Sequence, residues 1–100
     1  IMKLNEKIGN FIRNARVSKG LSEKELASLI SVSQQQISRY ERGISTLSIE
    51  NILILLNALN IPFDEFSNKI IKPEQNRLFY LLIDELETDG VIHVGNLKNI

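Results

Sequence analysis

Five polar side chains gather on one face if residues 34–42 form a helix. At about 100° per residue, this face holds Gln34, Gln35, Ser38, Arg39 and Arg42. Glutamine can form two hydrogen bonds with adenine N6 and N7, and arginine can form two with guanine O6 and N7. We therefore interpret the face as a surface that reads base pairs in the major groove of double-stranded DNA. Alternatively, these side chains only keep a surface helix hydrated.

The opposite face of the same segment is suited to packing. It holds Ile37, Tyr40, Glu41 and Ile44. A carboxylate among apolar side chains needs a partner, and Arg16 is the candidate because it borders the apolar stripe of the first predicted helix. An ion pair between Arg16 and Glu41 would hold that helix against the segment with the polar face. The alternative is that both side chains face solvent.

Start and stop signals divide the chain into six predicted helices. Apolar residues recur every three to four positions nearly throughout, and Asn5, Ser22, Ser33 and Ser48 each occupy a position suited to an N-cap. We expect residues 68–73 to form a hinge and residues 91–94 to form a short strand or a loop. The predicted helices cover residues 5–19, 22–30, 33–43, 48–61, 63–66 and 74–88.

Two short capped helices joined by a three-residue turn have the layout of a helix-turn-helix unit. In that unit the second helix lies in the DNA groove and the first helix braces it. Helices that meet so soon after a turn need a small residue on one and a branched apolar residue on the other. Ala27 and Ile37, ten positions apart, meet this requirement. We therefore expect residues 33–43 to contain the recognition helix.

Composition excludes several classes of protein. The 100 residues are 43% hydrophobic and 24% charged, as in one globular domain. Without cysteine there is no disulfide framework or thiolate metal site, and no apolar run approaches a membrane span. His93 stands alone, and no glycine loop of the phosphate-binding kind occurs. We expect a cytoplasmic protein that is not an enzyme and needs no metal, cofactor, small-molecule substrate or membrane.

Charge is distributed unevenly along the chain although the formal net charge is zero. Residues 1–50 hold eight Lys and Arg against five Asp and Glu, and residues 51–100 hold four against seven. The basic half contains the polar face described above. This asymmetry favours a polyanion as the partner of the first half.

The motifs in residues 8–66 together resemble the lambda-repressor-like helix-turn-helix family, also called the Cro or XRE type. The resemblance implies a five-helix bundle, symmetric dimers on double-stranded DNA, and regulation of transcription. We expect a repressor, and an activator is the alternative. We therefore expect an all-α fold in which this bundle is followed by a sixth helix and a short tail. The matching residues are Ile8-Gly9, Ile12, Arg16, Gly20-Leu21-Ser22, Leu26-Ala27, Val32-Ser33-Gln34, Ile37-Ser38, Glu41-Arg42-Gly43 and Leu59-Asn60-Ile61-Pro62.

The resemblance also implies roles for particular residues. The base-reading residues would be Gln34, Gln35, Ser38 and Arg39. Structural support would come from Arg16, Glu41, Ala27 and Ile37. Contacts with DNA phosphates would come from Ser22, Arg13, Lys24, Arg42, Ser45 and Thr46.

The chain departs from the family pattern at two positions. Ser31 occupies the turn where the family usually has a glycine in the left-handed conformation, which serine adopts only with strain. Glu23 stands where the family often has a glutamine that approaches the DNA backbone. A carboxylate there would repel phosphate, although it also favours the positive end of its helix.

The run from Ser33 to Glu41 is similar to a narrower group of proteins as well. These are the MrpJ-like enterobacterial regulators encoded with fimbrial operons, which typically repress motility genes. The likeness covers nine residues. It implies a fimbrial operon regulator within the larger family.

The last third of the chain is expected to be separate from the DNA-binding domain. We place that domain at residues 2–67, and we expect residues 68–100 to form a dimerisation segment. The alternative is that the sixth helix folds back on its own core. A rival function is an antitoxin-like or adaptor protein that binds another protein through this segment. The predicted dimer interface consists of Leu78, Phe79, Leu82, Ile83, Leu86 and Ile92.

Overall fold

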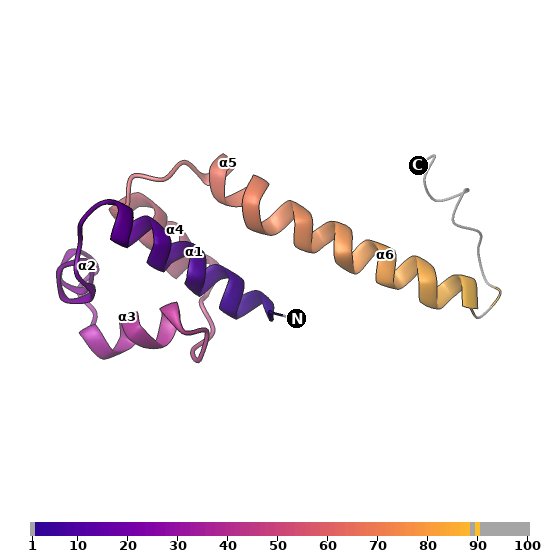
Figure 1. Cartoon of the computed structure of the whole chain (residues 1–100), viewed down its shortest axis with the longest axis horizontal. Coiled ribbons are helices and arrows are strands. Elements are labelled where there is room, and N and C mark those ends of the chain that lie inside the picture. The colour runs from indigo at the N-terminus through magenta and orange to yellow at the C-terminus, as the bar shows by residue number, and fades with distance from the viewer. Residues whose placement is uncertain (1, 89, 91–100) are drawn as a thin grey trace. The chain divides into compact units, whose positions relative to one another are not determined.

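The protein is all-helical in the part that the computed structural model describes, residues 2–88 and 90 (Figure 1). The chain divides into two compact units, Ile1–Ser67 and Asn68–Ile100, and each is described by itself. None of the described helices is long and apolar enough to cross a lipid bilayer. The predicted strand or loop at residues 91–94 lies outside the described residues. The helices are α1 (Leu4–Ser18), α2 (Glu23–Ile30), α3 (Gln34–Glu41), α4 (Ile49–Ala58), α5 (Phe63–Phe66), a π-helix (Ser67–Ile71) and α6 (Lys72–Thr88).

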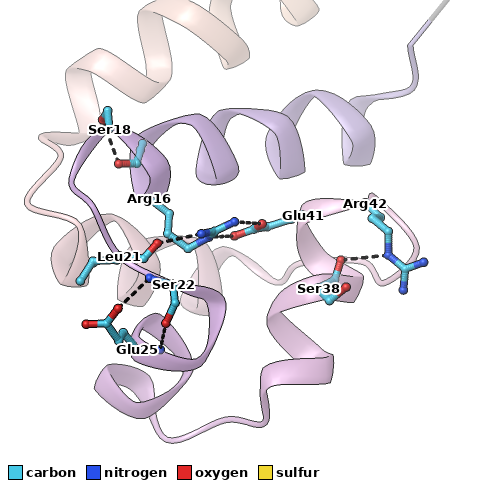
Figure 2. Close-up of polar contacts among 9 residues, drawn as sticks. Arg16, Ser18, Leu21, Ser22, Glu25, Ser38, Glu41 and Arg42 are labelled. Carbon is cyan, nitrogen blue, oxygen red and sulfur yellow. Dashed lines mark hydrogen bonds and ion pairs between the residues drawn. The ribbon is translucent and has the colours of Figure 1, made fainter.

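Serine caps determine where the short helices begin. The Ser22 hydroxyl accepts the N–H of Glu25 at 3.0 Å, and the Glu25 carboxylate accepts the N–H of Ser22 at 2.9 Å (Figure 2). The bond from the Ser22 backbone lowers the pKa of Glu25, and the Ser22 side chain adds to this effect. Ser33 and Ser48 accept equivalent bonds in the first turns of α3 and α4. The N-caps predicted at Ser22, Ser33 and Ser48 are therefore confirmed, whereas the one predicted at Asn5 is wrong, because α1 begins at Leu4 with Lys3 as its N-cap.

The turn between α2 and α3 passes through Ser31 in the left-handed conformation, with φ 59° and ψ 43°. The predicted strain is present, since a side chain in this region costs about 1–2 kcal/mol. The N–H of Val32 bonds to the carbonyl of Ala27 at 3.1 Å and so closes the end of α2. The turn keeps its tight path without a glycine.

The core of the first unit lies where α3 packs against α1 and α2, and where α2 packs against α4. Ala27 and Ile37 are both buried, as their spacing predicts. One predicted packing position is wrong. Ile44 is exposed because α3 ends at Glu41 and residue 44 belongs to the following loop.

Residues 68–73, predicted as a hinge, are helical. The π-helix Ser67–Ile71 follows α5 and leads directly into α6. Pro73, which suggested the break, lies within α6. Proline lacks the N–H that would bond to the carbonyl of Lys69, and proline is tolerated in a first turn because few donors are used there. π-Helical turns are rare and occur mostly as single turns within longer helices, where they interrupt the regular bonding without ending the helix.

Candidate nucleic-acid interface

Helix α3 carries the polar face predicted from the sequence. It lies at one edge of the first unit (Figure 1). Gln34, Gln35 and Arg39 are exposed, and Ser38 is half-buried. Ile37, on the other side of the helix, is fully buried. The helix therefore presents hydrogen-bonding side chains outward from a fixed apolar base.

A buried ion pair anchors the inner face of α3. Arg16 Nε donates to Glu41 Oε2 at 2.6 Å, and Arg16 Nη2 donates to Glu41 Oε1 at 2.9 Å (Figure 2). Arg16 Nη1 donates to the carbonyl of Leu21 at 2.8 Å. Hydrogen bonding to Glu41 raises the pKa of Arg16. The pair that the sequence predicts is thus present, and it joins α1, the loop before α2, and α3.

Gly9 allows α1 to approach the end of α3, which sequence reasoning did not predict. A Cβ atom on this residue would lie 2.6 Å from the carbonyl oxygen of Glu41 and still closer to that of Tyr40. Both neighbours are backbone atoms, which cannot rotate away. Gly9 therefore sets the distance between α1 and α3.

Arg39 is held toward the loop that follows α3. Its Nε donates to the Ser45 hydroxyl at 3.0 Å, and its carbonyl accepts the N–H of Ile44 at 3.0 Å. The guanidinium keeps its Nη groups for other acceptors. Sequence reasoning assigned Arg39 to bases and Ser45 to phosphate without linking them. Arg39 and Ser45 are only six residues apart, but the hydrogen bond between them depends on the path of the loop after α3. Their spacing alone therefore does not predict it.

The other predicted phosphate-binding residues fall into three places. Arg13 and Arg42 line an open hollow of about 470 Å³, together with Asn10, Arg16, Glu23, Ser38 and Glu41. Arg42 Nε also donates to the carbonyl of Ser38 at 3.4 Å (Figure 2). Ser22 and Lys24 are exposed where α2 begins, and the Thr46 hydroxyl accepts a bond from Asn5 at 3.3 Å in the loop after α3. Beside the paired Arg16 and Glu41, the hollow therefore combines two further cations with the carboxylate of Glu23.

Comparison with known proteins identifies the family. The sequence profile described as helix-turn-helix matches residues 12–66, which includes α2, the turn and α3. The chain belongs to this helix-turn-helix family. Its Cro or XRE type, which the sequence motifs suggest, is supported by the same match and by the relatives described next.

Two relatives of this helix-turn-helix protein illustrate the range of the family. The chain is 36% identical over 66 residues to an uncharacterised HTH-type transcriptional regulator of Rickettsia conorii, covering 66% of this chain and 53% of that protein. It is 28% identical over 85 residues to the antitoxin PezA of Streptococcus pneumoniae, covering 83% of this chain and 54% of that protein. The helix-turn-helix chain thus spans about half the length of these relatives.

Solved structures share the same fold. The restriction-modification controller protein C.AhdI from Aeromonas hydrophila is 38% identical, with a TM-score of 0.56 over 58% of this chain and 84% of its own. The controller protein C.Esp1396I, solved as a tetramer in complex with its natural 35 base-pair operator, is 25% identical. Its TM-score is 0.64 over 72% of this chain and 95% of its own. The helix-turn-helix assignment therefore holds in both sequence and structure.

Proposed function

We propose that the protein binds a specific sequence of double-stranded DNA as a homodimer and represses transcription, with α3 in the major groove. The observation that carries this proposal is the structure of α3 itself. Its outer face exposes Gln34, Gln35 and Arg39, while Glu41 on its inner face is fixed to Arg16. A rigid base holds base-reading side chains in one orientation, which specific readout requires.

Phosphate contacts would orient α3 in the groove. Arg13 and Arg42 border the hollow beside α3, and Ser45 and Thr46 lie in the loop that follows it. Contacts with phosphates fix the register of a protein on the duplex but carry no sequence information. A homodimer would place its two recognition helices about 34 Å apart, one helical turn of DNA. The narrower likeness to fimbrial operon regulators stays a hypothesis about which genes are controlled.

The first test compares Gln35→Ala and Arg39→Ala with the wild-type protein on fragments of its own upstream region. Each pair of hydrogen bonds from one side chain to one base contributes about 1–3 kcal/mol of discrimination against the wrong base. Each variant should therefore lose about 10- to 100-fold in affinity for the specific DNA sequence. Binding of wild-type protein should fall steeply with salt because phosphate contacts release counterions. Fluorescence anisotropy at several salt concentrations measures both effects.

Lys69→Ala is the matched control for Arg39→Ala. It removes one positive charge from the π-helix, outside the predicted DNA-binding residues, and should leave specific affinity unchanged. Equal and weak binding of the wild-type protein and both α3 variants to any duplex would overturn the proposal.

Glu23 offers a test in the opposite direction. Its carboxylate lines the same hollow as Arg13 and Arg42, where it would repel an approaching phosphate. Glu23→Gln should therefore raise DNA affinity, by about threefold to tenfold at low salt, and the gain should shrink as salt screens the repulsion. Glu50→Gln, at an exposed position in the first turn of α4, serves as the control for charge alone. Unchanged affinity in Glu23→Gln would mean that the hollow does not face the DNA backbone.

An antitoxin-like function is the second candidate. The similarity to the pneumococcal antitoxin covers 85 residues, more than the segment from residue 12 to residue 66 that defines the family. An antitoxin or adaptor would form a stable complex with a different protein through the second unit. Such a complex should survive Gln35→Ala and Arg39→Ala, whereas repression by groove readout should not.

A further inference from the structure

Helix α6 exposes five consecutive apolar residues, Leu78–Leu82, with exposed fractions between 38% and 55%. Runs of this kind on a soluble surface indicate an interaction site. In the predicted interface set, Ile83 is only 2% exposed and Leu86 is half-buried, and Ile92 lies outside the described residues. The accessible part of α6 is therefore centred on the exposed run.

Three of the exposed residues form one stripe. Leu78, Leu81 and Leu82 follow the i, i+3, i+4 spacing that brings side chains to one side of a helix. Such a stripe matches the apolar seam through which two helices pack. A helix of 17 residues is about 26 Å long, which is sufficient for such a pairing.

Two opposite charges flank this stripe at equal distances from its centre. Arg77 and Asp84 lie seven residues apart, so they fall on the same side of α6, and both are exposed. Two N–H groups of Arg77 bond to Glu74, at 3.0 and 2.7 Å, which leaves Nη1 able to donate elsewhere. In sequence, the midpoint between Arg77 and Asp84 falls within the stripe formed by Leu78, Leu81 and Leu82. A second α6 running in the opposite direction would therefore place Arg77 of each copy beside Asp84 of the other.

The distribution of all charges along α6, with Arg77 and Asp84 included, favours the same orientation. Its first half contains Lys72 and Arg77 against Glu74, whereas its second half contains Asp84, Glu85 and Glu87 without a basic residue. A parallel pair would align the acidic halves of the two copies, which costs free energy. An antiparallel pair brings each acidic half toward the basic half of its partner.

We propose that α6 pairs with α6 of a second copy in antiparallel orientation, joined by the leucine stripe and by reciprocal contacts between Arg77 and Asp84. This inference rests on the proposed homodimer and specifies its interface. A pair of this kind has twofold symmetry, because the same patch is used by both copies. The symmetry matches that of two recognition helices on a palindromic DNA site.

Charge reversal tests the pairing in the full chain without DNA. Arg77→Glu or Asp84→Arg alone should raise the dimer dissociation constant about tenfold, because each reversal turns two symmetric attractions into repulsions. Because Arg77→Glu also removes the two bonds to Glu74, whose side chain is 7% exposed, all variants are made with Glu74→Gln. In that background the double variant Arg77→Glu/Asp84→Arg should recover the dimerisation of the Glu74→Gln chain, which also shows that the chain still folds. Analytical ultracentrifugation over a concentration series measures these constants.

Mixing experiments distinguish the two orientations. In the antiparallel arrangement the double variant should pair with itself and exclude the wild-type chain, since like charges would then meet. In a parallel arrangement it would prefer the wild-type chain, and that result would overturn the proposal. A size-tagged wild-type chain separates these species in native mass spectrometry.

Two further outcomes would also overturn the pairing. One is a wild-type chain that stays monomeric at tens of micromolar, since its apolar stripe would then be covered within one chain. The other is a dimer that is insensitive to both single reversals. DNA binding is a separate readout: if it still falls with Gln35→Ala in a monomeric chain, the pairing fails while the proposed readout by α3 survives.

Discussion

Glu41→Ala is expected to lower the free energy of unfolding by about 3–5 kcal/mol, because it leaves the buried guanidinium of Arg16 without its partner. The Glu41 carboxylate occupies two of the donors of Arg16, and its side chain is only 3% exposed. No other carboxylate is described in contact with this guanidinium. Urea denaturation followed by circular dichroism measures the loss.

The double variant Arg16→Met/Glu41→Leu separates an unpaired charge from lost packing. Replacing both members of a buried ion pair by apolar residues of similar size is often neutral or stabilising, so this variant should recover most of the loss. Glu50→Ala, an exposed acid in α4, should change stability by less than about 0.5 kcal/mol. A loss below about 1 kcal/mol in Glu41→Ala would show that water reaches Arg16 and that the pair is not the anchor of α3.

Gly9→Ala is expected to destabilise the fold by about 1–3 kcal/mol through overpacking. Intrinsic helix propensity predicts the opposite sign, since alanine in a helix interior is favoured over glycine by about 0.5–1 kcal/mol. The contact should dominate because the added methyl group would meet the carbonyl oxygens of Tyr40 and Glu41. Thermal and urea unfolding give the sign directly.

Asn14→Ala is the matched control for Gly9→Ala. It lies exposed in the same helix and should gain a few tenths of a kcal/mol from propensity alone. A stabilised Gly9→Ala protein would mean that α1 can move away from α3 at little cost. In that case the position of the recognition helix would not depend on this close approach.

Local chemistry explains which features could be predicted from the sequence. The caps at Ser22 and Ser33 act on residues three positions away, so a short motif is sufficient to reveal them. The Arg16–Glu41 pair could be inferred although its members are 25 positions apart, because a carboxylate on an apolar face requires a partner. The left-handed turn at Ser31 follows from the family pattern.

The missed features depend on tertiary geometry. The role of Gly9 arises only when α1 crosses the end of α3, and nothing in the neighbouring sequence signals this crossing. Ile44 was placed on a helical face that continues past Glu41, but Gly43, with φ 71°, turns the chain away. Asn68 and Pro73 are typical of a break, yet a π-turn carries the helix past them. The Arg39–Ser45 bond likewise required the path of the loop.

The separation of the two faces of α3 has a consequence for divergence among such proteins. The groups that fix the helix, Glu41 and Ile37, point inward, whereas Gln34, Gln35 and Arg39 point outward and take no part in the core. Exposed substitutions away from special contacts usually change stability by no more than about 0.5 kcal/mol. Mutations can therefore exchange the outward residues one at a time without unfolding the intermediates. Under the proposed groove readout, such exchanges would change the preferred DNA sequence while the scaffold that presents these residues stays the same.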